Sequence, residues 1–155
     1  KFDYVEMNFS DIPIAVKNGK VDAGLVIHET QLSYSQEGII KILDVGEWWD
    51  KITDGLPVPL GINVMKDSFG LETIRKFDKF LQESIQFGLN HNDDAIEYAM
   101  KYGRGKPRDL IEKFVKMYVN DVTVNMGENG EKSIRRLFEM ALQKNLVPEF
   151  NLKIA

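Results

Sequence analysis

The sequence contains no cysteine, and only two histidines occur among its 155 residues. A chain without cysteine has no thiolate nucleophile, no disulfide framework, no Cys-based zinc site and no iron-sulfur cluster, because each of these needs that side chain. The two histidines, His28 and His91, are far apart and lack the His-x-x-x-His spacing of a metal site. We therefore expect neither thiol chemistry nor a bound metal.

The sequence also lacks an excess of basic residues and a long apolar run. The 20 Lys and Arg residues are outnumbered by 24 Asp and Glu residues, and the net charge of -4 disfavours a nucleic-acid partner. No stretch approaches the roughly 18 consecutive apolar residues of a membrane span. The glycine patterns of hydrolases, dinucleotide-binding proteins and phosphate loops are absent. We expect a globular protein that binds neither nucleic acid nor membrane.

The first part of the chain combines apolar segments with one short helix. Ser10 is a suitable N-cap, Pro13 fits the first helical turn, and Asn18-Gly19 ends the helix. Residues 21–27 are almost continuously apolar, as in a strand that is buried on both faces. Together with residues 2–7, they predict a parallel strand-helix-strand unit.

A change of composition near residues 57 to 70 divides an α/β part from an all-helical part. Further strands are predicted at residues 39–45 and 58–64, and two prolines make the second a candidate hinge. Apolar residues at helical spacing then continue toward the C-terminus. We assign residues 1–57 to the second half of one α/β lobe, and residues 58–155 to a crossover strand and a helical return to the other lobe.

His28 is the main candidate for chemistry, because it directly follows the predicted strand at residues 21–27. In open α/β sheets, ligands bind at the carboxyl ends of the strands. An imidazole can accept or give a proton near neutral pH, which suits a general base. The alternative interpretation is a structural histidine that is hydrogen-bonded to the next loop.

Four other patterns carry weaker signals. His91 precedes a helix and is interpreted as a solvated loop residue, and Trp48-Trp49 as one core and one surface aromatic residue. The polar residues 120–130 are interpreted as a loop between two helices. The basic segment 101–108 is interpreted as a solvated helix junction.

Several short motifs are distributed along the chain. The core Asp22-Ala23-Gly24-Leu25 is similar to a segment of many proteins of the type 2 periplasmic-binding fold. The motifs Ile27-His28-Glu29, Trp48-Trp49 and Leu56-Pro57-Val58-Pro59-Leu60-Gly61 are more specific. Together with residues 10–13, 18–29, 44–49, 55–61, 118–120 and 127–130, these motifs resemble the 1,4-dihydroxy-6-naphthoate synthases of the futalosine route to menaquinone. The resemblance covers essentially the whole chain.

The resemblance implies an α/β architecture, namely a two-lobe type 2 periplasmic-binding-protein-like fold with parallel-rich sheets around a cleft. The chain resembles only the latter part of the family, so we expect it to lack the N-terminal portion. The expected partners are a small-molecule substrate, the missing N-terminal segment that completes both lobes and, as one option, a second copy in a homodimer. The expected location is cytoplasmic.

The family is a group of lyases that convert cyclic dehypoxanthinyl futalosine to 1,4-dihydroxy-6-naphthoate without a metal or an organic cofactor. By resemblance, His28 is the base that removes a proton from the sugar portion of the substrate. Substrate-lining roles are assigned to five residues at strand ends and at the hinge, which are Ser10, Ile27, Glu29, Leu60 and Gly61. The sibling chorismate dehydratase, a non-catalytic solute-binding protein and a ligand-sensing domain remain as alternatives.

Overall fold

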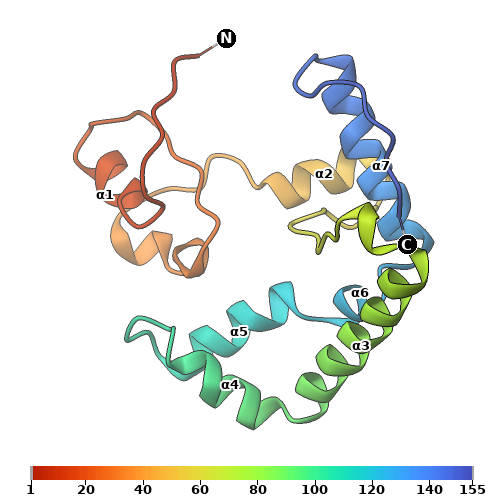
Figure 1. The fold of residues 1–155 in the computed structure, drawn as a ribbon. Helices are drawn as coiled ribbons and strands as arrows, with labels where there is room; N and C mark the ends of the chain where they lie inside the picture. Colours follow the sequence, from red (N-terminus) through yellow and green to blue (C-terminus); the bar gives the residue numbers. More distant parts are fainter. Residues whose placement is uncertain (1, 155) are drawn as a thin grey trace.

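The computed structural model describes residues 2–154, which form helices and coil. The α-helices are α1 (Ile12–Lys17), α2 (Val45–Thr53), α3 (Leu71–Asn90), α4 (Asn92–Met100), α5 (Arg108–Tyr118), α6 (Asp121–Val124) and α7 (Gly127–Gln143). Three short 3₁₀ helices are η1 (Glu29–Leu32), η2 (Tyr34–Glu37) and η3 (Asp67–Phe69). Figure 1 shows α1 and the first two 3₁₀ helices on one side of the molecule, and α2 and α7 on the other.

The predicted α/β fold with parallel-rich sheets is wrong for residues 2–154, because no strand is present in this part of the chain. The segments 2–7, 21–27, 39–44 and 58–64 run as coil (Figure 1). Apolar side chains on them are exposed, as shown by Ile40 and Val64, each 80% exposed. Apolar residues at period two favour a strand, but a strand also needs a neighbouring backbone for its ladder hydrogen bonds. No described segment provides that neighbour.

The short helix predicted in the first part of the chain is confirmed as α1, with a start that differs by one residue. Its N-cap is Asp11 rather than Ser10. The amide and the hydroxyl of Ser10 both donate to Oδ1 of Asn8 instead, at 3.0 and 2.8 Å. Pro13 lies in the first turn as predicted, and Gly19 follows the helix at a φ of 66°, which glycine adopts without strain.

A buried indole joins α2 to α7. Trp49 is 2% exposed, and its Nε1 donates to Oγ of Ser133 at 3.0 Å. The Ser133 hydroxyl donates in turn to the carbonyl of Pro57 at 2.5 Å. Trp48 is exposed, so the interpretation of the tryptophan pair as one core and one surface residue is confirmed.

The all-helical second part is confirmed by α3 to α7. α4 packs against α5, and each contributes a buried isoleucine, Ile96 and Ile111. Gly103 follows α4, and a Cβ added there would lie 3.0 Å from the Ile111 side chain, so a larger residue would require that side chain to shift. None of the described helices has both the length and the apolarity that crossing a membrane demands.

The loop predicted at residues 120–130 is wrong in part, because this segment contains α6 and the start of α7. Asn120 caps α6 by accepting a hydrogen bond from the amide of Val122 at 3.0 Å. Residues that cap helices are also the residues that favour loops, since both roles use a short polar side chain bonded to nearby backbone. A polar run alone therefore does not distinguish a loop from a pair of helix starts.

Candidate active site

His28 lies at the N-cap position of η1 with an extended backbone, at φ -112° and ψ -170°. Its imidazole lies 3.8 Å from the Phe9 ring, measured between centroids, with 36° between the planes. On α5, Phe114 lies 6.3 Å away and is inclined by 27°. The His28 side chain is 35% exposed. The imidazole is therefore held by aromatic neighbours while about a third of it remains open to solvent.

Within residues 2–154, neither ring nitrogen of His28 takes part in a hydrogen bond, and the described polar contact of the ring is Glu29 at 3.9 Å. The other histidine differs, because Nδ1 of His91 lies 2.8 Å from the carbonyl of Phe87. A structural histidine is held by such hydrogen bonds. Within residues 2–154, His28 lacks the kind of hydrogen bond that joins exposed His91 to the carbonyl of Phe87, and a chemical role for His28 stays a prediction.

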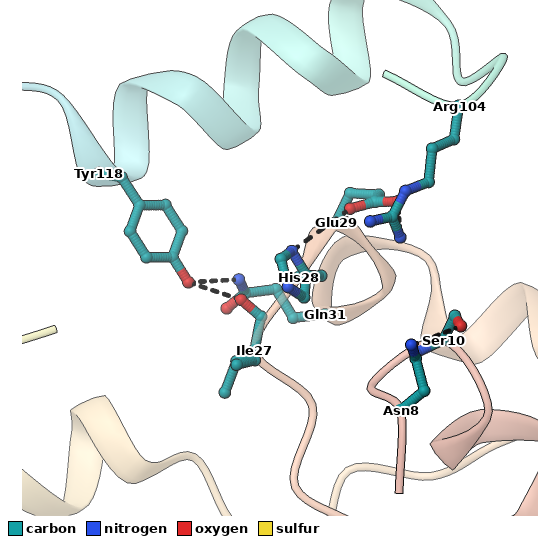
Figure 2. A network of polar contacts seen from close by, with 8 residues as sticks. All are labelled: Asn8, Ser10, Ile27, His28, Glu29, Gln31, Arg104 and Tyr118. Carbon is teal, nitrogen blue, oxygen red and sulfur yellow. Dashed lines mark hydrogen bonds and ion pairs between the residues drawn. The ribbon is translucent and has the colours of Figure 1, made fainter. Parts of the chain in front are cut away.

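Glu29 places a carboxylate between the imidazole and a guanidinium. Its Oε2 lies 3.9 Å from Nδ1 of His28, and its Oε1 lies 4.0 Å from an Nη of Arg104. The Glu29 side chain is only 13% exposed. Both separations exceed hydrogen-bond distance, so the contacts are electrostatic. Figure 2 shows this arrangement, with Arg104 reaching toward Glu29 from the connection between α4 and α5.

Tyr118, the last residue of α5, fixes the backbone that leads into His28. Its hydroxyl donates to the carbonyl of Ile27 at 2.9 Å and accepts a hydrogen bond from Nε2 of Gln31 at 3.1 Å (Figure 2). The packing of η1 on α5 brings these groups together. The residue before His28 and a residue of η1 are therefore tied to the same oxygen atom.

Arg104 is a site residue that the sequence interpretation missed, because segment 101–108 was assigned to a solvated helix junction. Its guanidinium lies 4.5 Å from the centroid of the Phe9 ring. The Phe9 ring also contacts the imidazole of His28. The glycines on both sides of Arg104 are the local signal that could have indicated a tight turn here. Nothing in the sequence indicated which residues this turn would approach.

Comparison with known proteins identifies the family. Residues 1–143 match the family model described as menaquinone biosynthesis. The chain belongs to this family. The resemblance found in the motifs is confirmed, because two curated relatives carry the name "1,4-dihydroxy-6-naphtoate synthase".

These relatives come from Thermus thermophilus and Streptomyces coelicolor, and each is 34% identical to this chain, over 142 and 146 residues. The matches cover 92% and 94% of this chain but 52% and 51% of the relatives, so the chain spans about half of their length. An X-ray crystal structure of a protein from Archaeoglobus fulgidus is also similar, with a TM-score of 0.86 and 43% identity. That match covers 92% of this chain and 54% of the solved chain.

The structure brings three of the five predicted substrate-lining residues to the surroundings of His28. Ile27 and Glu29 flank it, and Ser10 follows Phe9, whose ring contacts the imidazole. Leu60 and Gly61 lie exposed in a coil, and no described ring contact, hydrogen bond or ion pair connects them to His28. A role in lining the substrate stays a prediction for all five residues.

Two described surface hollows lie away from His28. One lies between α2 and α7, and the other is formed by the segment after α2 and the start of α7. The cleft expected around His28 does not coincide with either hollow. Among the described residues, no group of three or more His, Asp and Glu side chains is placed to hold a metal ion. We place the candidate site at His28 because of its side-chain chemistry rather than because of a hollow.

Proposed function

We propose that this chain forms part of a lyase that produces 1,4-dihydroxy-6-naphthoate from cyclic dehypoxanthinyl futalosine. The observation that carries the proposal is the environment of His28, whose ring contacts the Phe9 ring and faces the Glu29 carboxylate, while both of its ring nitrogens are free of hydrogen bonds within residues 2–154. The name of the curated relatives supports the naphthoate synthase over the sibling chorismate dehydratase.

Glu29 sets the roles of the two imidazole nitrogens. Its carboxylate faces Nδ1 at 3.9 Å, and a negative charge on that side favours the tautomer with the proton on Nδ1. Nε2 of His28 then carries the free lone pair. The exposed third of the side chain gives a substrate access to the imidazole. In this proposal, Nε2 removes a proton from the sugar portion of the substrate, and release of the sugar-derived part follows.

A second part of the proposal concerns the polypeptide that completes the site. The chain spans about half the length of its curated relatives, and large apolar side chains are exposed on its coil segments. We infer that polypeptide equivalent to the uncovered half of the relatives packs on these segments. The division at residues 57 and 58, a homodimer and a cytoplasmic location stay predictions.

The test is a turnover experiment with two histidine variants. The native gene product is incubated with cyclic dehypoxanthinyl futalosine, and release of the naphthoate is followed by mass spectrometry. His28→Ala is expected to lose at least about a hundredfold in rate, because a general base contributes about 10²- to 10⁴-fold. The matched control is His91→Ala, which removes the exposed histidine at the start of α4 and is expected to leave the rate unchanged.

Other outcomes would redirect the assignment. Turnover of chorismate in place of the futalosine derivative would assign the chain to the sibling dehydratase. Tight binding of the substrate without product, unaffected by His28→Ala, would identify a solute-binding protein and contradict a catalytic His28.

A further inference from the structure

Arg104 presents hydrogen-bond donors that the described part of the chain does not use. Its ion-pair contact with Glu29 is 4.0 Å long, and within residues 2–154 its guanidinium makes no hydrogen bond. Other arginines in the chain form close pairs, such as Arg108 with Asp93 at 2.8 Å and Arg135 with Glu131 at 2.7 Å. An arginine whose role was to neutralise Glu29 would approach it at a similar distance. The Arg104 side chain is instead 52% exposed, and its guanidinium makes no hydrogen bond within residues 2–154 that would occupy its donors.

The guanidinium of Arg104 lies close to two groups that also contact His28. It lies over the Phe9 ring at 4.5 Å, and the same ring contacts the imidazole at 3.8 Å. The Glu29 carboxylate faces both the guanidinium of Arg104 and the imidazole of His28. The backbone of Arg104 is left-handed, at a φ of 50°, a conformation that non-glycine residues rarely adopt. The turn therefore presents Arg104 at the site in spite of a backbone preference against that conformation.

The chemistry of an arginine in this position suits an organic anion. The planar guanidinium matches a carboxylate through two parallel hydrogen bonds, which an ammonium cannot reproduce. The curated relatives are named for a naphthoate, which carries a carboxylate. A ligand carboxylate that approached Glu29 alone would be repelled, and a cation beside Glu29 removes that penalty.

We propose that Arg104 binds the carboxylate of the aromatic ligand whose sugar portion reacts at His28. The inference rests on the proposed function and adds a recognition residue to it. His28 acts on a proton, whereas Arg104 recognises the charge of the ligand and contributes to ligand binding.

The test compares a charged and a neutral ligand of the same shape. Binding of 1,4-dihydroxy-6-naphthoate and of its carboxamide to the native gene product is measured under reducing conditions by calorimetry. Arg104→Gln is expected to weaken naphthoate binding by about 10- to 100-fold, the range for a lost hydrogen bond to a charged group, and to leave carboxamide binding within about twofold. Arg104→Lys keeps the charge and is expected to retain part of the preference for the carboxylate. Arg108→Gln is the matched control, because it removes a neighbouring positive charge that is paired with Asp93.

Turnover separates this inference from the proposed function. In Arg104→Gln, KM for the futalosine substrate is expected to rise while kcat changes little. If the wild-type protein turns over the substrate and Arg104→Gln binds the naphthoate as tightly as wild type does, the role of Arg104 is overturned and the proposed function stands. If Arg104→Gln loses the same affinity for the naphthoate and for the carboxamide, Arg104 has a structural role and the inference is also overturned. A wild-type protein that neither binds the naphthoate nor turns over the substrate would overturn both proposals. If Arg104→Gln does not fold, a carboxylate preference in folded Arg104→Lys that is smaller than in wild type supports the inference, and a preference equal to wild type overturns it.

Discussion

The hydroxyl of Tyr118 holds the peptide that leads into His28, and this contact yields a prediction at the scale of single residues. Tyr118→Phe removes the donor to the Ile27 carbonyl and the acceptor for Gln31. We expect the free energy of unfolding to fall by about 1 kcal/mol, the usual net value of an intramolecular hydrogen bond. Because the imidazole loses part of its support, kcat is expected to fall more than KM rises. Chemical denaturation and steady-state kinetics measure the two effects.

Tyr102→Phe is the matched control for this prediction. Tyr102 is exposed on the α4 side of the molecule, and its hydroxyl lies 3.3 Å from that of Tyr98. This change is expected to leave kcat unchanged. If Tyr118→Phe lowers stability but leaves kcat at the wild-type value, Tyr118 supports the fold without positioning His28.

At the same scale, the sequence indicates His28 as the candidate base, which stays a prediction, but it does not indicate the surroundings of that residue. His28 could be selected because a titratable side chain directly follows an apolar run, which is a local pattern. Tyr118 is 91 positions away from Ile27 along the chain, and only the packing of η1 on α5 brings them together. Phe9 and Arg104 reach the site in the same way, so a single sequence contains no local sign of their role.

Among the secondary-structure elements, α2 depends on an ionised cap. Asp44 accepts hydrogen bonds from the amides of Gly46 and Glu47 at 3.0 and 3.3 Å, and Lys41 lies 3.2 Å away. The Glu47 amide, followed by Lys41, lowers the pKa of Asp44 below its ordinary value of 3.8. A carboxylate whose pKa is lower in the folded state stabilises the fold above its unfolded pKa, and this contribution is lost as the pH falls through the folded value.

Two substitutions at this cap separate the hydrogen bonds from the charge. Asp44→Ala is expected to lower the free energy of unfolding by about 1 kcal/mol, the usual loss at an N-cap. Asparagine is also a good N-cap, so the difference in free energy of unfolding between Asp44→Asn and wild type measures the contribution of the charge. We expect this difference to be constant near neutral pH and to shrink below about pH 4. Denaturation curves measured across this pH range provide the test.

Asp50→Ala is the control for the cap, because Asp50 is exposed on the same helix and forms no described side-chain hydrogen bond or ion pair. It is expected to change the free energy of unfolding by less than about 0.5 kcal/mol. If Asp44→Ala and Asp50→Ala lower the free energy of unfolding by the same amount, Asp44 does not stabilise α2 as a cap.

The helices could be predicted from the sequence, whereas the strands could not. A helix completes its backbone hydrogen bonds within its own segment, so apolar residues at helical spacing suffice to predict it, as in α3 and α7. The run at residues 21–27 has the composition of a buried strand, but its pairing depends on another segment. In the described part of the chain no such segment is present, and Leu25 and Ile27 are exposed.

For the whole molecule, these exposed apolar segments predict complementation. Polypeptide equivalent to the uncovered half of the relatives is expected to raise the thermal midpoint of this chain and to reduce its binding of a hydrophobic dye. The physical reason is that burying apolar surface stabilises a fold by about 25 cal/mol for each Å² removed from water. Mixing the two polypeptides and recording melting curves measures the effect.

Ile40→Lys tests which surface is covered. Ile40 is exposed in the coil before α2, so the change is expected to leave the melting temperature of the isolated chain unaffected. It is expected to diminish the rise in melting temperature that the complementary polypeptide produces. Phe80→Lys, at an exposed position on α3, is the comparison. A rise that is lost only in Phe80→Lys would place the complementary polypeptide on α3 and contradict the prediction.

Phe9 connects three distant parts of the molecule, since its ring comes from the N-terminal segment and contacts both His28 and Arg104. One aromatic side chain thus contacts both the proposed proton acceptor and the proposed anion-binding group. A substitution that reshapes this ring alters both functions in one step. Effects at Phe9, His28 and Arg104 will therefore not add independently. In descendants of this protein, a change in reactivity and a change in ligand charge would tend to be inherited together.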